Sequence, residues 1–169
     1  MKNKVAPGLG VLAAFLVSAL GPAAQAYADS PWLSASSGGH GQAYGHARTT
    51  QTGYGQLSGS QGATFGLQAT YQNWSTKSDY RGAYGVVTGF HSYLQPYETL
   101  WGEYYTRVTA AKTTETSRIT STTSTSAYAG VTFTNAYGGA GSMSIQVKVC
   151  ADKKWAVDSC SSTWTTTAF

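Results

Sequence analysis

The two cysteines of the chain, Cys150 and Cys160, are the residues best suited to covalent chemistry. Such a pair can be redox-active, hold a metal ion or form a structural disulfide. A redox pair is usually a closely spaced Cys-x-x-Cys at a helix start, whereas here nine residues intervene and the flanks look extended. A zinc ion needs about four ligands, and no histidine is close in sequence. The disulfide is therefore favoured, with a metal site and free thiols as the alternatives.

Acid–base or nucleophilic catalysis needs side chains in a recognisable arrangement. We find no Gly-x-Ser-x-Gly elbow and no glycine loop that leads into a helix to cradle phosphate. A glycosidase needs two carboxyl groups facing each other across a cleft. Glu98 and Glu103, placed five residues apart on one strand, would face opposite sides. We therefore expect no enzyme activity, no cofactor and no metal site.

Aromatic and basic residues punctuate a segment that is rich in Gly, Ser and Gln, from Ser34 to Gly62. The possible partner-binding residues there are His40, Tyr44, His46, Arg48 and Tyr54. In an extended chain, residues two apart lie on the same side. Within HGQAYGHAR these would be His40, Gln42, Tyr44, His46 and Arg48. Three interpretations stay open: a flexible tether, a docking arm that orders on a partner by strand addition, and a histidine metal site.

The N-terminus has the layout of a secretory signal peptide over residues 1–28. Lys2 and Lys4 precede an apolar run, and small residues then flank cleavage positions before Tyr27 and before Asp29. The run is too short for a membrane-spanning helix. We expect a secreted, extracellular protein whose mature form starts at Tyr27 or Asp29, with no membrane association.

Export would place the cysteines where disulfides persist. The bond would close a hairpin with Lys153 and Lys154 at its tip, and would stabilise the fold by about 2–3 kcal/mol.

The charge of the chain is small once the signal peptide is set aside. The formal net charge of +4 includes the two N-terminal lysines, so the remainder carries +2, and its basic residues are scattered. Nucleic-acid binding usually needs a clustered basic face. We therefore expect no nucleic-acid partner.

Hydrophobic residues alternate with polar ones along most of the chain after residue 62, which predicts β-strands. The inward faces are expected to carry Phe65, Leu67, Ala69 and Tyr71; Tyr84, Val86, Phe90 and Leu94; and Met143, Ile145, Val147 and Val149. Gly82, Gly85 and Gly89 suggest a bulge or bend, and Gln95–Tyr97 a turn. The sequence thus predicts an all-β protein, an antiparallel β-sandwich or small barrel of about 6–8 strands.

Two segments depart from this pattern. The glycine-rich residues 29–62 are expected to form an N-terminal arm, leaving residues 63–169 as the β domain. Residues Lys112–Ala127 are dominated by Ser and Thr. Threonine suits an exposed strand face, so an edge hairpin is expected there, with a solvated loop or a Thr-x-Thr ice-binding face as alternatives.

Binding is the remaining function class. The chain has 12 Tyr, 5 Trp and 5 Phe, and tyrosine is favoured at recognition surfaces because it joins a rigid ring to a hydroxyl. One hypothesis is an adaptor that joins secreted protein subunits through the arm. The other is a carbohydrate or cell-wall binding module that stacks sugars on exposed Tyr or Trp.

The junction AQAYADS, the arm GGHGQAYGHARTTQTGYGQ, the Tyr-rich β body and the pair in VCADKKWAVDSC together resemble small secreted actinobacterial proteins. The layout is similar to that of the adaptor subunit of umbrella toxin particles. The resemblance implies a non-enzymatic part of an antibacterial toxin complex. Its partners would be a lectin-like subunit, contacted by residues 34–62, and a repeat-bearing toxin.

Overall fold

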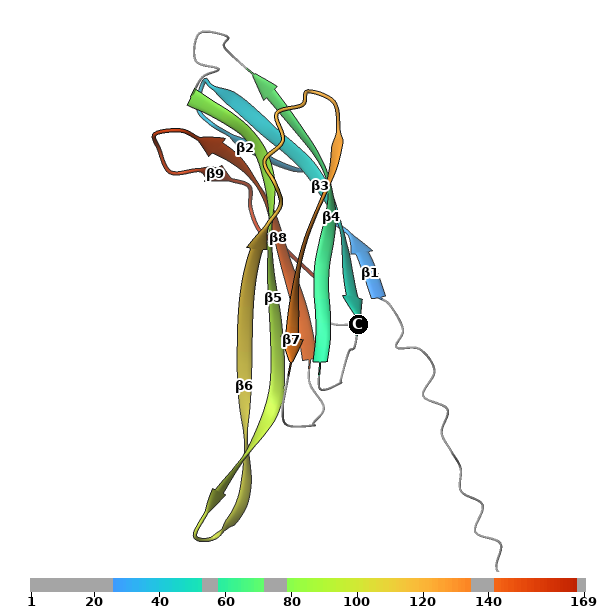
Figure 1. The fold of residues 1–169 in the computed structure, drawn as a ribbon, viewed down its shortest axis with the longest axis vertical. Coiled ribbons are helices and arrows are strands. Elements are labelled where there is room, and N and C mark those ends of the chain that lie inside the picture. Colours follow the sequence, from blue (N-terminus) through green and yellow to red (C-terminus); the bar gives the residue numbers. More distant parts are fainter. Residues whose placement is uncertain (1–25, 53–57, 72–78, 135–141, 167–169) are drawn as a thin grey trace, which may run out of the picture.

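The chain folds into two β-sheets that face each other (Figure 1). The computed structural model describes residues 26–52, 58–71, 79–134 and 142–166. Within these ranges there are ten strands: β1 Ala26–Asp29, β2 Leu33–Ser36, β3 Gly41–Thr52, β4 Ser58–Tyr71, β5 Tyr80–Thr99, β6 Gly102–Glu115, β7 Thr125–Thr134, β8 Ser142–Lys153, β9 Ser159–Cys160 and β10 Trp164–Thr166. The described ranges contain no helix that could cross a membrane.

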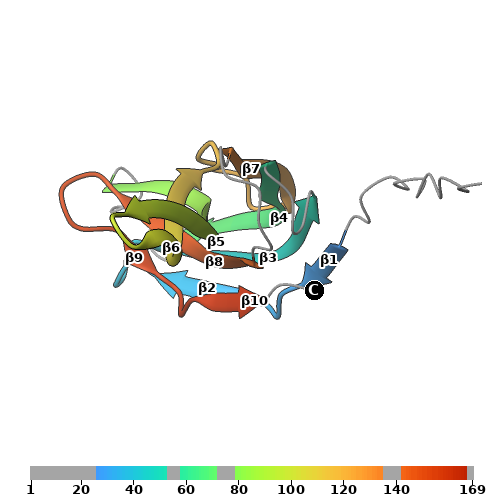
Figure 2. The same ribbon diagram turned by 90° about the horizontal axis from the view of Figure 1, so that it is seen from below.

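All strand pairs are antiparallel. One sheet has the order β1-β3-β4-β7, with β2 pairing with β3 beside β1. The other has the order β10-β8-β5-β6, with β9 pairing with β8 beside β10. Seen from below, the two sheets curve around a common interior (Figure 2). The predicted all-β sandwich is confirmed, and the additional strands are short ones at the sheet edges.

The core lies between β3 and β4 on one side and β5 and β8 on the other. Phe65 and Leu67 of β4 and Ile145, Val147 and Val149 of β8 are fully buried, as their alternation predicts. Burial of each such side chain stabilises the fold by about 1.5–3 kcal/mol.

The glycine-rich segment is part of this core, and its predicted separation as an arm over residues 29–62 is wrong. It supplies β2, β3 and the first residues of β4, and every second residue of β3 is buried. The inward residues of β3 are small because large side chains approach from across the core. A Cβ on Gly41 would lie 2.5 Å from the Tyr80 ring of β5, and one on Gly45 would lie 3.1 Å from Val149 Cγ2 of β8.

The inward face of β5 also carries small residues. Gly85 and Gly89 face inward, where added Cβ atoms would lie 2.7 Å from the Phe65 ring and 3.1 Å from the Phe133 ring. The expected inward face of Tyr84, Val86, Phe90 and Leu94 is wrong: Tyr84 and Val86 are buried with Cys150 in a separate outer cluster. Of the three glycines, Gly82 has a φ of 127° and lies at a register shift, which confirms a bulge there.

The connection from β6 to β7 crosses from one sheet to the other. Residues Lys112–Ala127, expected as an edge hairpin, contain the end of β6, a largely exposed loop and the start of β7. Ile119 in this loop exchanges backbone hydrogen bonds of 2.8 and 2.9 Å with Ala83 of β5. The loop is thereby held against the sheet that β6 leaves.

Candidate binding surfaces

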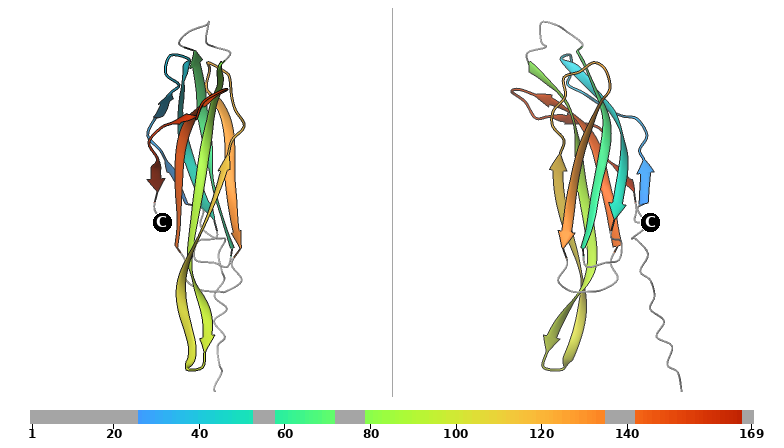
Figure 3. Two further views of the ribbon diagram at one scale, coloured as in Figure 1. Left: turned by 90° about the vertical axis from the view of Figure 1, so that its left-hand side faces the viewer. Right: turned by 45° about the vertical axis from the view of Figure 1, so that its right-hand side comes forward.

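A two-stranded ribbon projects from one end of the sandwich. β5 pairs with β8 only as far as Ser92, whereas its pairing with β6 continues to Thr99 opposite Gly102. The ribbon is visible below the other strands in Figure 1 and in both views of Figure 3. The expected turn at Gln95–Tyr97 is wrong, because these residues belong to β5 and the turn is Leu100–Trp101. Pro96 is tolerated because β5 has no neighbour beyond β6 here.

Large apolar side chains gather at the end of this ribbon. Leu100 is 99% exposed and Trp101 is 88% exposed. Tyr97 and Tyr104 lie opposite each other and stack, with ring centroids 5.8 Å apart, and Tyr105 is also exposed. We call these five residues the hairpin tip. None of them contributes to the core, so folding of the chain does not explain their presence.

Two carboxylates flank the hairpin tip. Glu98 lies directly opposite Glu103, and the hydroxyl of Tyr105 donates to Glu103 Oε1 at 3.2 Å. The prediction that Glu98 and Glu103 face opposite sides of one strand is wrong, because a turn separates them and places them on the same face. Neither carboxylate takes part in the ion pairs formed among the described residues. The hairpin tip is therefore apolar with a negative margin.

An open cleft of about 800 Å³ lies on the outer face of the first sheet. Its floor crosses β3, β4 and β7, where His46 pairs with Gly66 and Gly66 with Ser126. Gly66 keeps the floor low, since a Cβ there would lie 2.8 Å from His46 Cε1 and 3.2 Å from Ser124 Oγ. Trp32, which is 67% exposed, stands at one side with its ring edge-to-face with His46 at 4.7 Å.

An ion pair forms another part of the cleft wall. Arg48 donates from Nε and Nη2 to the two carboxylate oxygens of Asp29, at 2.8 and 3.0 Å. These hydrogen bonds from Arg48 hold the pKa of Asp29 below its usual value. The Arg48 guanidinium also lies 5.6 Å from the centre of the Tyr27 ring. Residues Ala26–Ala28, which belong to the predicted signal peptide, thus lie in the strand that carries part of this cleft.

The predicted partner-binding residues of β3 lie where their alternation places them. Tyr44, His46 and Arg48 point to the outer face of the sheet, with Ala43, Gly45 and Ala47 buried between them. Only His46 and Arg48 line the cleft. Tyr44 donates to the side chain of Gln42. His40 precedes β3 and has its Nδ1 3.9 Å from Asp79 Oδ2, and Tyr54 lies outside the described residues.

Two of the partner-binding residues predicted from the sequence, His46 and Arg48, line the cleft, whereas Trp32, Asp29 and the hairpin tip were not predicted. Trp32 gave no signal because it lies between two very short strands. The hairpin tip could have been found from Leu100–Trp101 followed by glycine, because a two-residue turn between alternating segments is typical of a hairpin.

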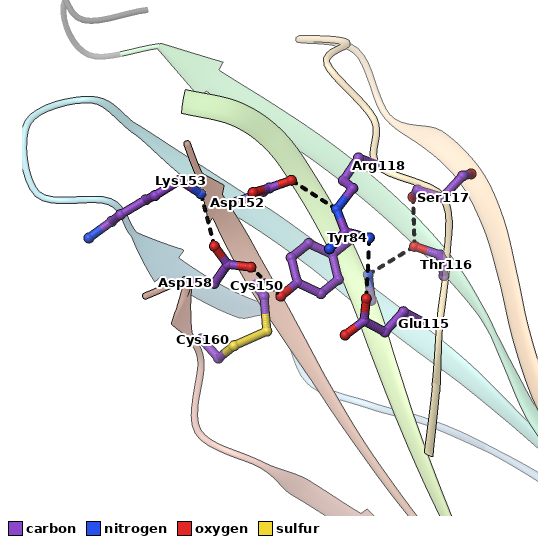
Figure 4. Close-up of polar contacts among 11 residues, drawn as sticks. Tyr84, Glu115, Thr116, Ser117, Arg118, Cys150, Asp152, Lys153, Asp158 and Cys160 are labelled. Carbon is purple, nitrogen blue, oxygen red and sulfur yellow. Dashed lines mark hydrogen bonds and ion pairs between the residues drawn. A yellow bond between two sulfur atoms is a disulfide. The ribbon is translucent and has the colours of Figure 1, made fainter. Parts of the chain in front are cut away.

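The disulfide anchors a polar cluster on the outer face of the second sheet (Figure 4). Cys150 lies directly opposite Cys160 and is bonded to it, which confirms the predicted pairing. Asp158 in the closed loop accepts from the Tyr84 hydroxyl at 2.6 Å and from the Lys153 backbone N–H at 2.9 Å. Burial and this hydrogen bond raise the pKa of Tyr84.

The same cluster fixes the β6–β7 loop. Arg118 donates to Asp152 at 2.8 Å and to Glu115 at 3.2 Å, and its guanidinium lies 4.3 Å from the centre of the Tyr84 ring. Thr116 Oγ1 accepts from the Gly85 backbone N–H at 3.0 Å. Each charged group is matched by an opposite charge or a hydrogen-bond donor, as expected of a cluster that holds a loop in place.

No group of three or more His, Cys, Asp or Glu side chains in the described residues could hold a metal ion. Comparison of the chain with protein-family models, curated proteins and solved structures finds no match. The surfaces themselves are therefore the basis for assigning a function.

Proposed function

We propose that this is a secreted, non-enzymatic binding protein that attaches to a partner protein through the hairpin tip. The observation that carries the proposal is the near-complete exposure of Leu100 and Trp101 at the end of a projecting ribbon. Contiguous exposed apolar side chains of this kind mark interaction sites. Tryptophan and tyrosine are also the residues that dominate binding energy at protein interfaces.

The outer part of the ribbon is separate from the hydrophobic core that stabilises the sandwich. This outer part has only two strands, and no third strand of the described residues pairs with it there. An isolated two-stranded ribbon is marginally stable in water. Burial of the hairpin tip in a pocket would remove this apolar surface from water and order the ribbon. The energetics of the ribbon therefore favour a partner that encloses its end.

The charges around the hairpin tip define the partner's chemistry. Like charges directly opposite each other on a ribbon are destabilising, so Glu98 and Glu103 would gain from nearby cations. They would be repelled by an anionic lipid surface. We therefore infer a protein partner with an apolar pocket that is rimmed by Lys or Arg.

This mode of attachment replaces the expected docking of residues 34–62 by strand addition. β3 already pairs with β4 along one edge and with β1 and β2 along the other. Its backbone groups are therefore not available to a further strand. The resemblance to toxin-particle adaptors supplies a first candidate partner, a secreted lectin-like subunit, and the hairpin tip is the surface we propose for it.

The test compares Trp101→Ala with Trp155→Ala, since both side chains are at least 80% exposed and lie on different loops. Purification of each tagged protein from culture supernatant of the producing organism should recover one stoichiometric partner with the wild type and with Trp155→Ala. Trp101→Ala should weaken that complex by about 30-fold or more, which is the effect of losing a dominant interface residue.

A photo-crosslinking residue at position 100 should join the chain to the same partner. Equal recovery of the partner by Trp101→Ala, or crosslinking at 100 to no specific chain, would refute the proposal. Binding of the wild type to anionic vesicles without a protein partner would also refute it.

A further inference from the structure

The outer cleft has the dimensions of a small-molecule site and is independent of the hairpin tip. Its volume of about 800 Å³ falls in the range of ligand sites, which measure roughly 300–1,000 Å³. Its residues belong to the first sheet and its connections, whereas the hairpin tip belongs to β5, β6 and the turn between them. The cleft can therefore serve a second binding function.

One wall of the cleft is an aromatic platform. The Trp32 indole is mostly exposed, and its contact with His46 at 4.7 Å fixes its tilt over the floor. A ring held in this way offers an apolar face at little conformational cost. The C–H face of a pyranose sugar is a flat apolar surface of matching size.

Hydroxyl groups line the rest of the cleft. Thr64, Ser124 and Ser126 line the cleft together with Trp32, and each hydroxyl can both donate and accept a hydrogen bond. A ligand on the indole would thus meet short polar side chains along its edge. That combination suits a ligand that has an apolar face and hydroxyl groups at its perimeter.

The Asp29–Arg48 pair determines the charge of the ligand. Arg48 uses Nε and Nη2 toward Asp29, which leaves Nη1 able to donate, while the carboxylate oxygens retain lone pairs. The pair is electrically neutral, so it offers donors and acceptors without attracting an anion. Planar groups of this type are well suited to adjacent hydroxyls of a sugar.

We propose that the cleft binds a neutral oligosaccharide, with one sugar ring on Trp32 and its hydroxyls on the Arg48–Asp29 pair and the floor. The protein would then bind a glycan on one face and a protein partner at the ribbon end. This proposal does not depend on the proposed function, because the two sites share no residue.

Calorimetric titration of the full secreted chain tests the proposal. The ligands are neutral oligosaccharides derived from chitin, cellulose, xylan, mannan and starch. At least one should bind the wild type. Trp32→Ala and Arg48→Lys should each weaken binding at least tenfold, the first by removing the platform and the second by removing the bidentate pair with Asp29.

Trp155→Ala and Trp101→Ala are the controls, because each removes an exposed indole outside the cleft. Both should bind the glycan as the wild type does, and circular dichroism should show unchanged folding for all variants. Trp101→Ala should lose the protein partner alone and Trp32→Ala the glycan alone, so that failure of one proposal is distinguishable from failure of the other. Absence of binding to every neutral glycan, unaltered binding by Trp32→Ala, or binding of a heparin oligosaccharide in their place would overturn the proposal.

Discussion

Glycine and alanine occupy inward positions in this protein because large side chains of the facing sheet fill the space above them. Gly85 is the clearest case, since an added Cβ would lie 2.7 Å from three atoms of the Phe65 ring. Its φ is not positive, so the residue is required for space and not for backbone conformation. Interiors are packed closely enough that one methyl group at such a point is felt.

We predict that Gly85→Ala lowers the free energy of unfolding by about 1–3 kcal/mol, the usual cost of overpacking a core. Urea denaturation monitored by tryptophan fluorescence measures the change. Phe65→Leu removes the ring that the new methyl group meets, so the double variant should lose less than the sum of the two single losses. Additive losses of unfolding free energy, or an unchanged unfolding free energy for Gly85→Ala, would show that the contact with Phe65 does not require glycine at position 85.

At the scale of elements, β3 shows why hydrophobic periodicity does not predict that the glycine-rich segment belongs to the core. Its inward residues are Gly, Ala, Thr and Gln, so it carries no aliphatic alternation even though it alternates in burial. Hydrophobic periodicity detects strands that bring large side chains to the core. It misses a strand whose small inward residues leave space for the large side chains of the facing sheet.

We predict that Ala43→Lys prevents stable folding, whereas Tyr44→Lys does not. Ala43 is fully buried and Tyr44 is on the outer face, and an unpaired charge in a core is among the most destabilising changes. Thermal melting followed by circular dichroism distinguishes the two, and deletion of Ser34–Gln56 should likewise abolish the folded state. A cooperative melt for Ala43→Lys close to that of the wild type would contradict the assignment of β3 to the core.

The strands with large alternating residues were predictable from sequence, and so was the disulfide. Phe65, Leu67 and Ala69 of β4 and the alternate residues from Met143 to Val149 of β8 are buried as predicted, and Cys150 and Cys160 lie opposite each other in neighbouring strands. The prediction for β5 has the wrong face inward, because Tyr84 and Val86 form a separate buried cluster with Cys150 and do not pack between the sheets. Of the cleft, only His46 and Arg48 could be named. Trp32 lies in the connection between β1 and β2, and Asp29 reaches the cleft through the pairing of β1 with β3, and the local sequence pattern encodes neither arrangement.

The whole molecule divides into a sandwich that contains the hydrophobic core and a ribbon that contributes no residue to that core. The core cluster draws its residues from β2, β3, β4, β5, β7, β8 and the β6–β7 loop, and it includes no residue of the ribbon beyond Ser92. A partner could therefore enclose the ribbon end without disturbing the sheets. The cleft on the first sheet would remain open in such a complex.

Shortening the ribbon tests this division most directly. Leu94 lies opposite Arg107, so Gln95–Thr106 can be replaced by Asn-Gly, a pair suited to a two-residue hairpin turn. We predict that the urea midpoint of the shortened protein is close to that of the wild type. Purification of the shortened protein from culture supernatant should no longer recover the protein partner. Retention of the partner at wild-type affinity, or loss of the folded state, would contradict the account.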